Sequence, residues 1–211
     1  MKTNSPMQPD RRRAVKTLAG ALALPMTTGF LMGCAPDKPQ FKSIDLTGAD
    51  YAQGFSLADY NGQVRTINDF AGKVVVVFFG YIQCPDVCPT SMAELAQVKQ
   101  QLGPDADKLQ AIFITVDPER DKPELLKAYM GNFDPTFLAL RPTPEQLPQV
   151  AQDFKIYYKK VTGKKKGSYT MDHSAGSYIF DPKGHIRLYS RYGSGAEVLA
   201  SDIRLLIKTT R

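Results

Sequence analysis

The sequence predicts an α/β fold in which a mixed β-sheet is covered by helices on both faces. Two continuous apolar runs rich in β-branched residues, 74–79 and 109–116, are typical of strands buried on both sides. Segments with helical periodicity alternate with further strand-like runs, which implies a layered sandwich built as one domain. The hydrophobic content of 43% and the charged content of 23% exclude a disordered chain.

The other elements follow from turn and capping signals. Asn61 and Gly62 indicate a hairpin closed by a type I′ turn, in which both central residues have positive φ. Asp121 is expected to cap one helix, and Ser194 with Glu197 another. Helices are expected over residues 90–102, 123–130, 143–154 and 194–208, and strands over 55–58, 64–67, 137–140, 156–161, 177–180 and 185–189.

This order of elements predicts a thioredoxin-like sandwich over residues 41–211. The mixed central sheet carries an extra N-terminal β-hairpin, and helices lie on both of its faces. In open α/β sheets, ligands bind at the carboxyl ends of the central strands. The functional site is therefore expected directly after residues 74–79 and 109–116.

Residues 1–33 have the pattern of an export signal. A basic cluster at 11–16 precedes an apolar stretch, 18–32, of about 15 residues, which is shorter than the roughly 20 residues a spanning helix needs. The stretch ends in Leu-Met-Gly-Cys, which resembles a bacterial lipobox and predicts cleavage before Cys34, lipidation of Cys34 and a tether over 34–40. The domain is then lipid-anchored on the extracytoplasmic, periplasmic face of a membrane. Sec and twin-arginine export both remain open, as does an uncleaved anchor.

The net charge does not indicate a nucleic-acid partner. The whole chain carries +6, but the leader contributes five basic residues and one acidic residue. The remainder therefore has 22 basic and 20 acidic residues, a net charge of +2. A nearly neutral domain has no electrostatic reason to bind phosphate backbones, and nucleic acid is excluded as a partner.

Cys84 and Cys88 lie in the turn between the strand at 74–79 and the next helix. Pro89 is expected at the first helical position, where the helix dipole favours the thiolate form of Cys88. The spacing lets the two sulfurs bind one ion or join as a disulfide, and an exported domain meets an oxidising compartment. A purely structural bridge is disfavoured because so short a ring stabilises little.

Two thiolates alone hold a soft ion linearly, and a third ligand would complete a trigonal site, for which the chain offers two histidines. His185 follows a turn and is expected at the surface, whereas His173 is placed on a loop leading into an edge hairpin, within reach of the cysteines. Two thiolates and one imidazole favour Cu(I), because structural Zn²⁺ would need four ligands and a lipidated Cys34 could not supply the fourth. Cu(II) remains open as a second bound state.

At these residues the chain resembles the Sco/SenC family, copper chaperones of cytochrome c oxidase assembly. The resemblance covers nearly all of residues 41–208 and implies that Cys84, Cys88 and His173 are the copper ligands. It also implies a thioredoxin-like fold, and a role in delivering copper to the Cu(A) site of oxidase subunit II or in keeping that site's cysteines reduced. The matching segments are Cys-Pro-Asp-Val-Cys-Pro at 84–89, Val-Asp-Pro-Glu-Arg-Asp at 116–121, Asp-His-Ser at 172–174 with Tyr178, and Asp-Pro-Lys-Gly at 181–184.

Three functions remain open at this point. The first is a metallochaperone, not an enzyme, that receives electrons from a thiol–disulfide reductant and passes copper to subunit II or another copper acceptor. The second is an extracytoplasmic thiol–disulfide oxidoreductase acting through Cys84 and Cys88, and the third is a copper sensor. His173 separates the first two, because a thiol–disulfide enzyme needs no distant imidazole. Asp117 is expected to support the metal or dock a partner, and Asp172 to orient the imidazole or cap its loop.

Overall fold

The computed structural model describes residues 39–210. The predicted signal peptide, Cys34 and most of the tether lie outside these residues. The described residues form one compact unit. No helix within the described residues is long and apolar enough to cross a bilayer.

The core of the domain is a six-stranded mixed sheet in the order β1-β10-β9-β4-β5-β6. Strands β4, β5 and β6 run parallel, whereas β9 pairs antiparallel with β4, and β10 and β1 continue that pattern. Every residue of β4 and β5 is buried, which confirms the prediction from their continuous apolar sequence. The strands are β1 (Ile44–Asp45), β4 (Val74–Gly80), β5 (Leu109–Thr115), β6 (Leu138–Leu140), β9 (Ser177–Phe180) and β10 (Ile186–Ser190).

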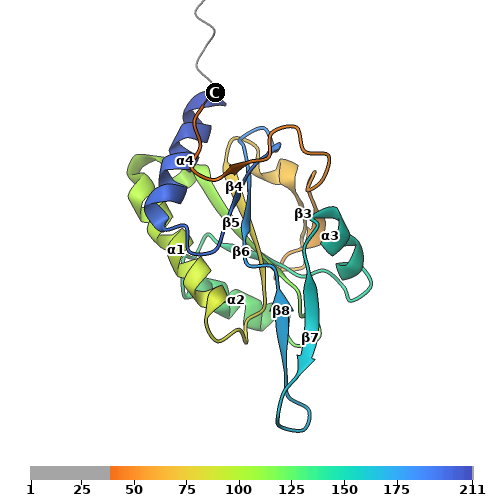
Figure 1. Cartoon of the computed structure of the whole chain (residues 1–211). Coiled ribbons are helices and arrows are strands. Elements are labelled where there is room, and N and C mark those ends of the chain that lie inside the picture. The colour runs from red at the N-terminus through yellow and green to blue at the C-terminus, as the bar shows by residue number, and fades with distance from the viewer. Residues whose placement is uncertain (1–38, 211) are drawn as a thin grey trace, which may run out of the picture. The chain divides into compact units, whose positions relative to one another are not determined.

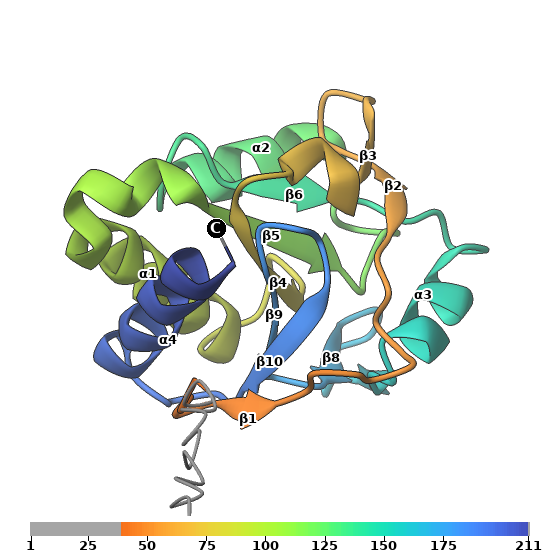
Figure 2. The same cartoon turned by 90° about the horizontal axis from the view of Figure 1, so that it is seen from above.

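Helices cover both faces of this sheet, as predicted. Figure 2 shows α1 and α4 together on one side, with α3 and the β2–β3 hairpin on the other. The α-helices are α1 (Val87–Leu102), α2 (Pro123–Gly131), α3 (Leu147–Asp153) and α4 (Ala196–Thr209). Two 3₁₀ helices, η1 (Ile67–Phe70) and η2 (Gly103–Lys108), precede β4 and β5.

The N-terminal hairpin forms, but its turn differs from the prediction. β2 (Ser56–Ala58) pairs antiparallel with β3 (Val64–Thr66). Gly62 has a φ of 82°, whereas Asn61 does not adopt positive φ, so the type I′ assignment was wrong. The buried carboxylate of Asp59 instead accepts the backbone N–H groups of Asn61 and Gln63, at 2.8 and 3.0 Å, and organises a longer loop.

A second hairpin projects from the body of the domain and carries His173. β7 (Tyr158–Thr162) and β8 (Tyr169–His173) form their own two-stranded sheet, which extends away from the main sheet (Figure 1). The sequence placed His173 on a loop beside an edge hairpin, and both expectations were wrong. β8 is a strand with Met171 buried and its neighbours Thr170 and Asp172 exposed, and the β9–β10 hairpin is internal because β1 takes the edge.

The helix starts also differ from the capping predictions. α1 begins at Val87, which makes Pro89 its third residue rather than its first. The N-cap of α2 is Lys122, and the carboxylate of Asp121 bonds elsewhere. α4 starts after Gly195, because the hydroxyl of Ser194 donates to the Arg191 carbonyl oxygen instead of forming a capping box. The side chains of Asp121 and Ser194 have a tertiary or turn partner that sequence spacing does not reveal.

Candidate metal site

The two cysteines are placed by the end of β4 and the start of α1. The turn between these elements is closed by a bond from the Cys84 N–H to the Tyr81 carbonyl oxygen, 3.2 Å. Cys84 is half-buried in this turn, whereas Cys88 is fully buried in the first turn of α1. Gly80 leaves room for Cys88, since a Cβ at that position would come within 2.8 Å of the Cys88 Sγ. Both cysteines are free thiols in this structure.

The β7–β8 hairpin brings His173 to the cysteines. The His173 Nε2 lies 3.4 Å from the Cys88 Sγ, and the Cys84 Sγ accepts the Cys88 backbone N–H at 3.5 Å. One donor atom from each of the three side chains lies within 4.8 Å of the other two. The structure therefore brings together the three residues that the sequence singled out, from β4–α1 and from a strand 85 residues later.

The tautomer of His173 follows from its second contact. Its Nδ1 lies 2.9 Å from the carbonyl oxygen of Ser174, which can only accept a hydrogen bond. Nδ1 therefore carries the proton, and the lone pair of Nε2 faces Cys88. A metal-binding histidine commonly has this arrangement, with one nitrogen held by a backbone carbonyl and the other free to coordinate.

Two aromatic side chains hold the imidazole ring from its sides. Phe78, on β4, and Tyr81 both meet the His173 ring edge-on, with interplanar angles of 88°. Their ring centroids lie 6.1 and 5.8 Å from the centroid of the imidazole ring. Both aromatic residues are buried. In the sequence, the position of Tyr81 three residues before Cys84 is the signal that it lines the site.

Burial controls the protonation of the site. It raises the pKa of the Cys88 thiol, with the neighbouring Cys84 contributing in the same direction. The expectation that the helix dipole would favour the Cys88 thiolate was therefore wrong for the metal-free protein, since removal of the sulfur from water outweighs the dipole. Burial also lowers the pKa of His173, so its imidazole is neutral at pH 7 and available as a ligand.

Asp121 and Asp117, on the loop that follows β5, support the site without entering it. Asp121 is fully buried, and its Oδ2 accepts bonds from the Thr115 hydroxyl at 2.5 Å and from the Ile82 N–H at 3.2 Å. It thus ties the end of β5 to the cysteine turn, and burial raises its pKa to about 6. Asp117, 3% exposed, pairs with Arg120. It is too buried to dock a partner, which corrects that part of the prediction.

The remaining candidates lie apart from the donor group. Asp172 is exposed on β8 next to His173, and the Ser174 carbonyl oxygen, not Asp172, holds the imidazole nitrogen. His185 is exposed beside Asp181 in the β9–β10 turn, as expected. Two further residues could not be assigned from their sequence. Ser174 acts through its backbone carbonyl oxygen, which any residue type supplies, and Arg120 acts through Gln83 and Tyr169, which are 37 and 49 residues away.

Comparison with known proteins gives consistent matches. The family model described as SCO1/SenC matches residues 45–208. "Protein SCO2 homolog, mitochondrial" from Bos taurus is 36% identical over 170 residues, which cover 79% of this chain and 64% of that protein, less than two thirds of its length. A "SCO2-like protein" from Rickettsia felis is 32% identical over 152 residues, covering 71% of this chain and 74% of the relative.

Solved structures agree with these matches. The structure of Bradyrhizobium japonicum ScoI with copper bound is 42% identical, with a TM-score of 0.65, and covers 72% of this chain and 96% of that one. Yeast Sco1 with copper bound is 30% identical, with a TM-score of 0.66, over 74% of this chain and 87% of the other. The predicted thioredoxin-like fold is thereby confirmed, and the chain belongs to the SCO1/SenC family.

Proposed function

We propose that this protein is a copper chaperone that holds one copper ion between Cys84, Cys88 and His173 and supplies the Cu(A) site of cytochrome c oxidase subunit II. The observation that carries this proposal is the convergence of two thiol sulfurs and one imidazole nitrogen within 4.8 Å. Copper bound in the Bradyrhizobium and yeast relatives supports the choice of metal.

The donor set favours Cu(I) over Zn²⁺. Soft thiolates and imidazole in a three-coordinate arrangement suit Cu(I), whereas structural Zn²⁺ is almost always held by four ligands. Within residues 39–210, no fourth His, Cys, Asp or Glu joins the group. The two cysteines also differ in solvent exposure, since Cys88 is buried and Cys84 is half-exposed. Cys84 is therefore the sulfur that an incoming or outgoing copper ligand reaches first.

Loading and release follow from the protonation states. The Cys88 thiol is protonated in the metal-free protein because burial raises its pKa, so copper binding must expel that proton. The neutral imidazole of His173 needs no deprotonation, and its Nδ1 stays bonded to the Ser174 carbonyl oxygen. Transfer then proceeds by ligand exchange at Cys84 with thiolates of the acceptor, a step that moves the ion without oxidising it.

Single substitutions of the three donors test this function. We expect wild-type protein to bind one copper per chain, and Cys84→Ser, Cys88→Ser and His173→Ala each to weaken Cu(I) binding severely or abolish it. Competition with a chromophoric Cu(I) chelator measures the affinity, and His185→Ala is the matched control because that imidazole is exposed and outside the donor group. Wild-type affinity in the His173→Ala variant would contradict the three-ligand site.

A thiol–disulfide oxidoreductase is the second candidate function. It is favoured by the same two free thiols, which lie close enough to form a disulfide after a small movement. The two functions differ in the need for His173, since electron exchange with a partner's disulfide requires the sulfurs alone. Full thiol–disulfide reductase activity of the His173→Ala variant would favour this candidate over the chaperone.

We further propose that Cys34 is lipidated and that the domain works on the extracytoplasmic face of a membrane. The Leu-Met-Gly-Cys sequence and the short apolar core before it support this proposal. Wild-type protein should sediment with membranes and resist salt washing, because two or more acyl chains give stable anchoring. Cys34→Ala should lose the acyl label and the salt-resistant fraction. Recovery of mature protein that begins at Met1 would contradict cleavage.

A further inference from the structure

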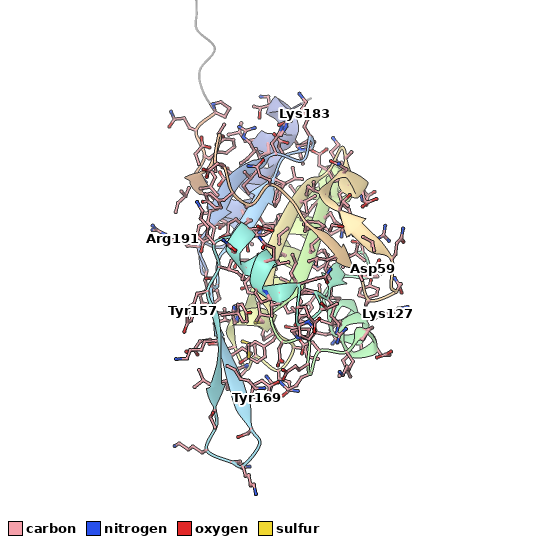
Figure 3. All side chains as sticks on the ribbon, turned by 90° about the vertical axis from the view of Figure 1, so that its right-hand side faces the viewer. Asp59, Lys127, Tyr157, Tyr169, Lys183 and Arg191 are labelled. Atoms are coloured by element: carbon pink, nitrogen blue, oxygen red, sulfur yellow. The ribbon has the colours of Figure 1, made fainter. Side chains whose placement is uncertain are left out.

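The β7–β8 hairpin needs an anchor to hold His173 in place. Its two strands pair only with each other, and a two-stranded hairpin is marginally stable by itself in water. Figure 3 shows it reaching away from the sheet, with Tyr157 at its base and Tyr169 further along it. The Tyr157 N–H bonds to the Ser174 hydroxyl at 2.9 Å, and the Ser174 N–H to the Tyr157 carbonyl oxygen at 3.0 Å. These bonds close the base of the hairpin but do not connect it to the cysteine turn.

Arg120 makes that connection. Its Nε pairs with the Oδ2 of Asp117, in its own loop, and its Nη1 donates to the Gln83 Oε1 at 3.1 Å and to the Tyr169 carbonyl oxygen at 2.9 Å. Gln83 is the residue before Cys84, and Tyr169 is the first residue of β8. One guanidinium group thus joins the loop after β5, the cysteine turn and the strand that carries His173.

Aromatic stacking reinforces the same link. The Arg120 guanidinium carbon lies 3.5 Å from the centre of the Tyr169 ring and 5.7 Å from the centre of the Tyr81 ring. The Tyr169 hydroxyl donates to the Asp117 Oδ1 at 2.9 Å, so the tyrosine is held by its ring, its hydroxyl and its backbone. Tyr81 in turn meets the His173 ring. A planar cation with a fork of donors can make all of these contacts together, and a lysine cannot.

We propose that Arg120 is a positioning residue that sets the distance between His173 and the two cysteines. Tyr169 and His173 are four residues apart on one strand and so face the same side of β8. Because the strand is extended and paired with β7 throughout, holding Tyr169 against the cysteine turn fixes the direction in which His173 points. Arg120 itself does not touch the donor atoms and acts through β8. The copper-binding consequence of this inference rests on the proposed function.

The metal-free protein offers the first test, which does not depend on copper. In Arg120→Gln, backbone amides of residues 169–173 should exchange with deuterium faster than in wild type, measured by hydrogen exchange with mass spectrometry. The matched control is Arg65→Gln, because Arg65 and Asp59 form an equivalent ion pair, with side chains 23% and 0% exposed against 20% and 3% for Arg120 and Asp117. Equal exchange of residues 169–173 in both variants would overturn the proposal.

The second test separates positioning from a general loss of stability. We expect Arg120→Gln to weaken Cu(I) binding by about 10- to 100-fold, the range typical for residues that orient metal ligands, while Arg65→Gln leaves it unchanged. In the His173→Ala background, Arg120→Gln should cause no further loss, because the ligand it positions is already gone. An equal loss in both backgrounds would contradict a role through His173.

Arg120→Lys decides between bridging and simple charge neutralisation. The lysine keeps a positive charge beside Asp117 but cannot reach Gln83 and Tyr169 together or stack flat on the tyrosine ring. We expect it to behave as Arg120→Gln does, and full recovery of wild-type exchange and affinity would refute the bridging role. If wild-type protein binds no copper, the proposed function fails, and the exchange experiment still decides whether Arg120 holds β8.

Discussion

Oxidation of Cys84 and Cys88 to a disulfide is expected to eliminate tight Cu(I) binding. A disulfide carries no thiolate, so two of the three proposed ligands disappear together, leaving the His173 imidazole alone. The two sulfurs already belong to a group whose donor atoms lie within 4.8 Å, and Cys84 is half-exposed in a turn. Closing the bond therefore requires a local shift and two electrons taken up by an added oxidant such as diamide.

The experiment compares Cu(I) retention by reduced and diamide-oxidised protein, using a chelator of known affinity as competitor. Copper should also protect both thiols from alkylation, scored by mass spectrometry of the peptide that contains residues 84 and 88, which is separate from Cys34. Reduction of the diamide-treated protein with dithiothreitol is the control, because it regenerates both thiols and should restore Cu(I) retention. Oxidised protein that retains Cu(I) as tightly as reduced protein would show that the cysteines are not the ligands.

The free energy of unfolding should fall with rising pH through ionisation of Asp121. Burial raises its pKa from 3.8 to about 6, so the folded state binds a proton more tightly than the unfolded state. Between these two values the folded protein holds more protons, and stability therefore decreases as pH increases. A shift of this size corresponds to about 3 kcal/mol of stability, which is fully present below the unfolded pKa and is lost as the pH rises from ~4 to ~6.

Urea unfolding of wild type and Asp121→Asn at a series of pH values measures this contribution. Subtracting the two free energies of unfolding cancels the contributions of the other titrating groups. As the pH rises through this window, the free energy of unfolding of wild type should fall relative to that of Asp121→Asn. Thr115→Val provides a second arm, since loss of the hydroxyl donor to the Asp121 carboxylate should raise its pKa further and extend the fall to higher pH. A constant difference between wild type and Asp121→Asn would contradict a raised pKa.

Elements defined by the pattern of their own residues were predicted well. The continuous apolar runs of β4 and β5 predicted strands buried on both faces, and every residue of both strands is buried. The Asn61-Gly62 region was correctly placed between paired strands. Predictions that needed a side chain's partner failed more often. Asp121 was assigned to a helix cap, yet its partners are Thr115 and the Ile82 N–H, the second of them 39 residues away.

The sequence by itself determined the chemistry of the site, since the residue types and the spacing of Cys84 and Cys88, with His173, limit the metals that could bind. Only the tertiary structure decided that His173 lies on a projecting strand, that its Nε2 faces Cys88, and that the Cys88 thiol is protonated. Ligand type is a property of single residues, and hydrophobic periodicity is a property of short segments. Strand pairing, hydrogen-bond partners and desolvation arise between distant segments, and at Cys88 desolvation outweighed the local helix dipole.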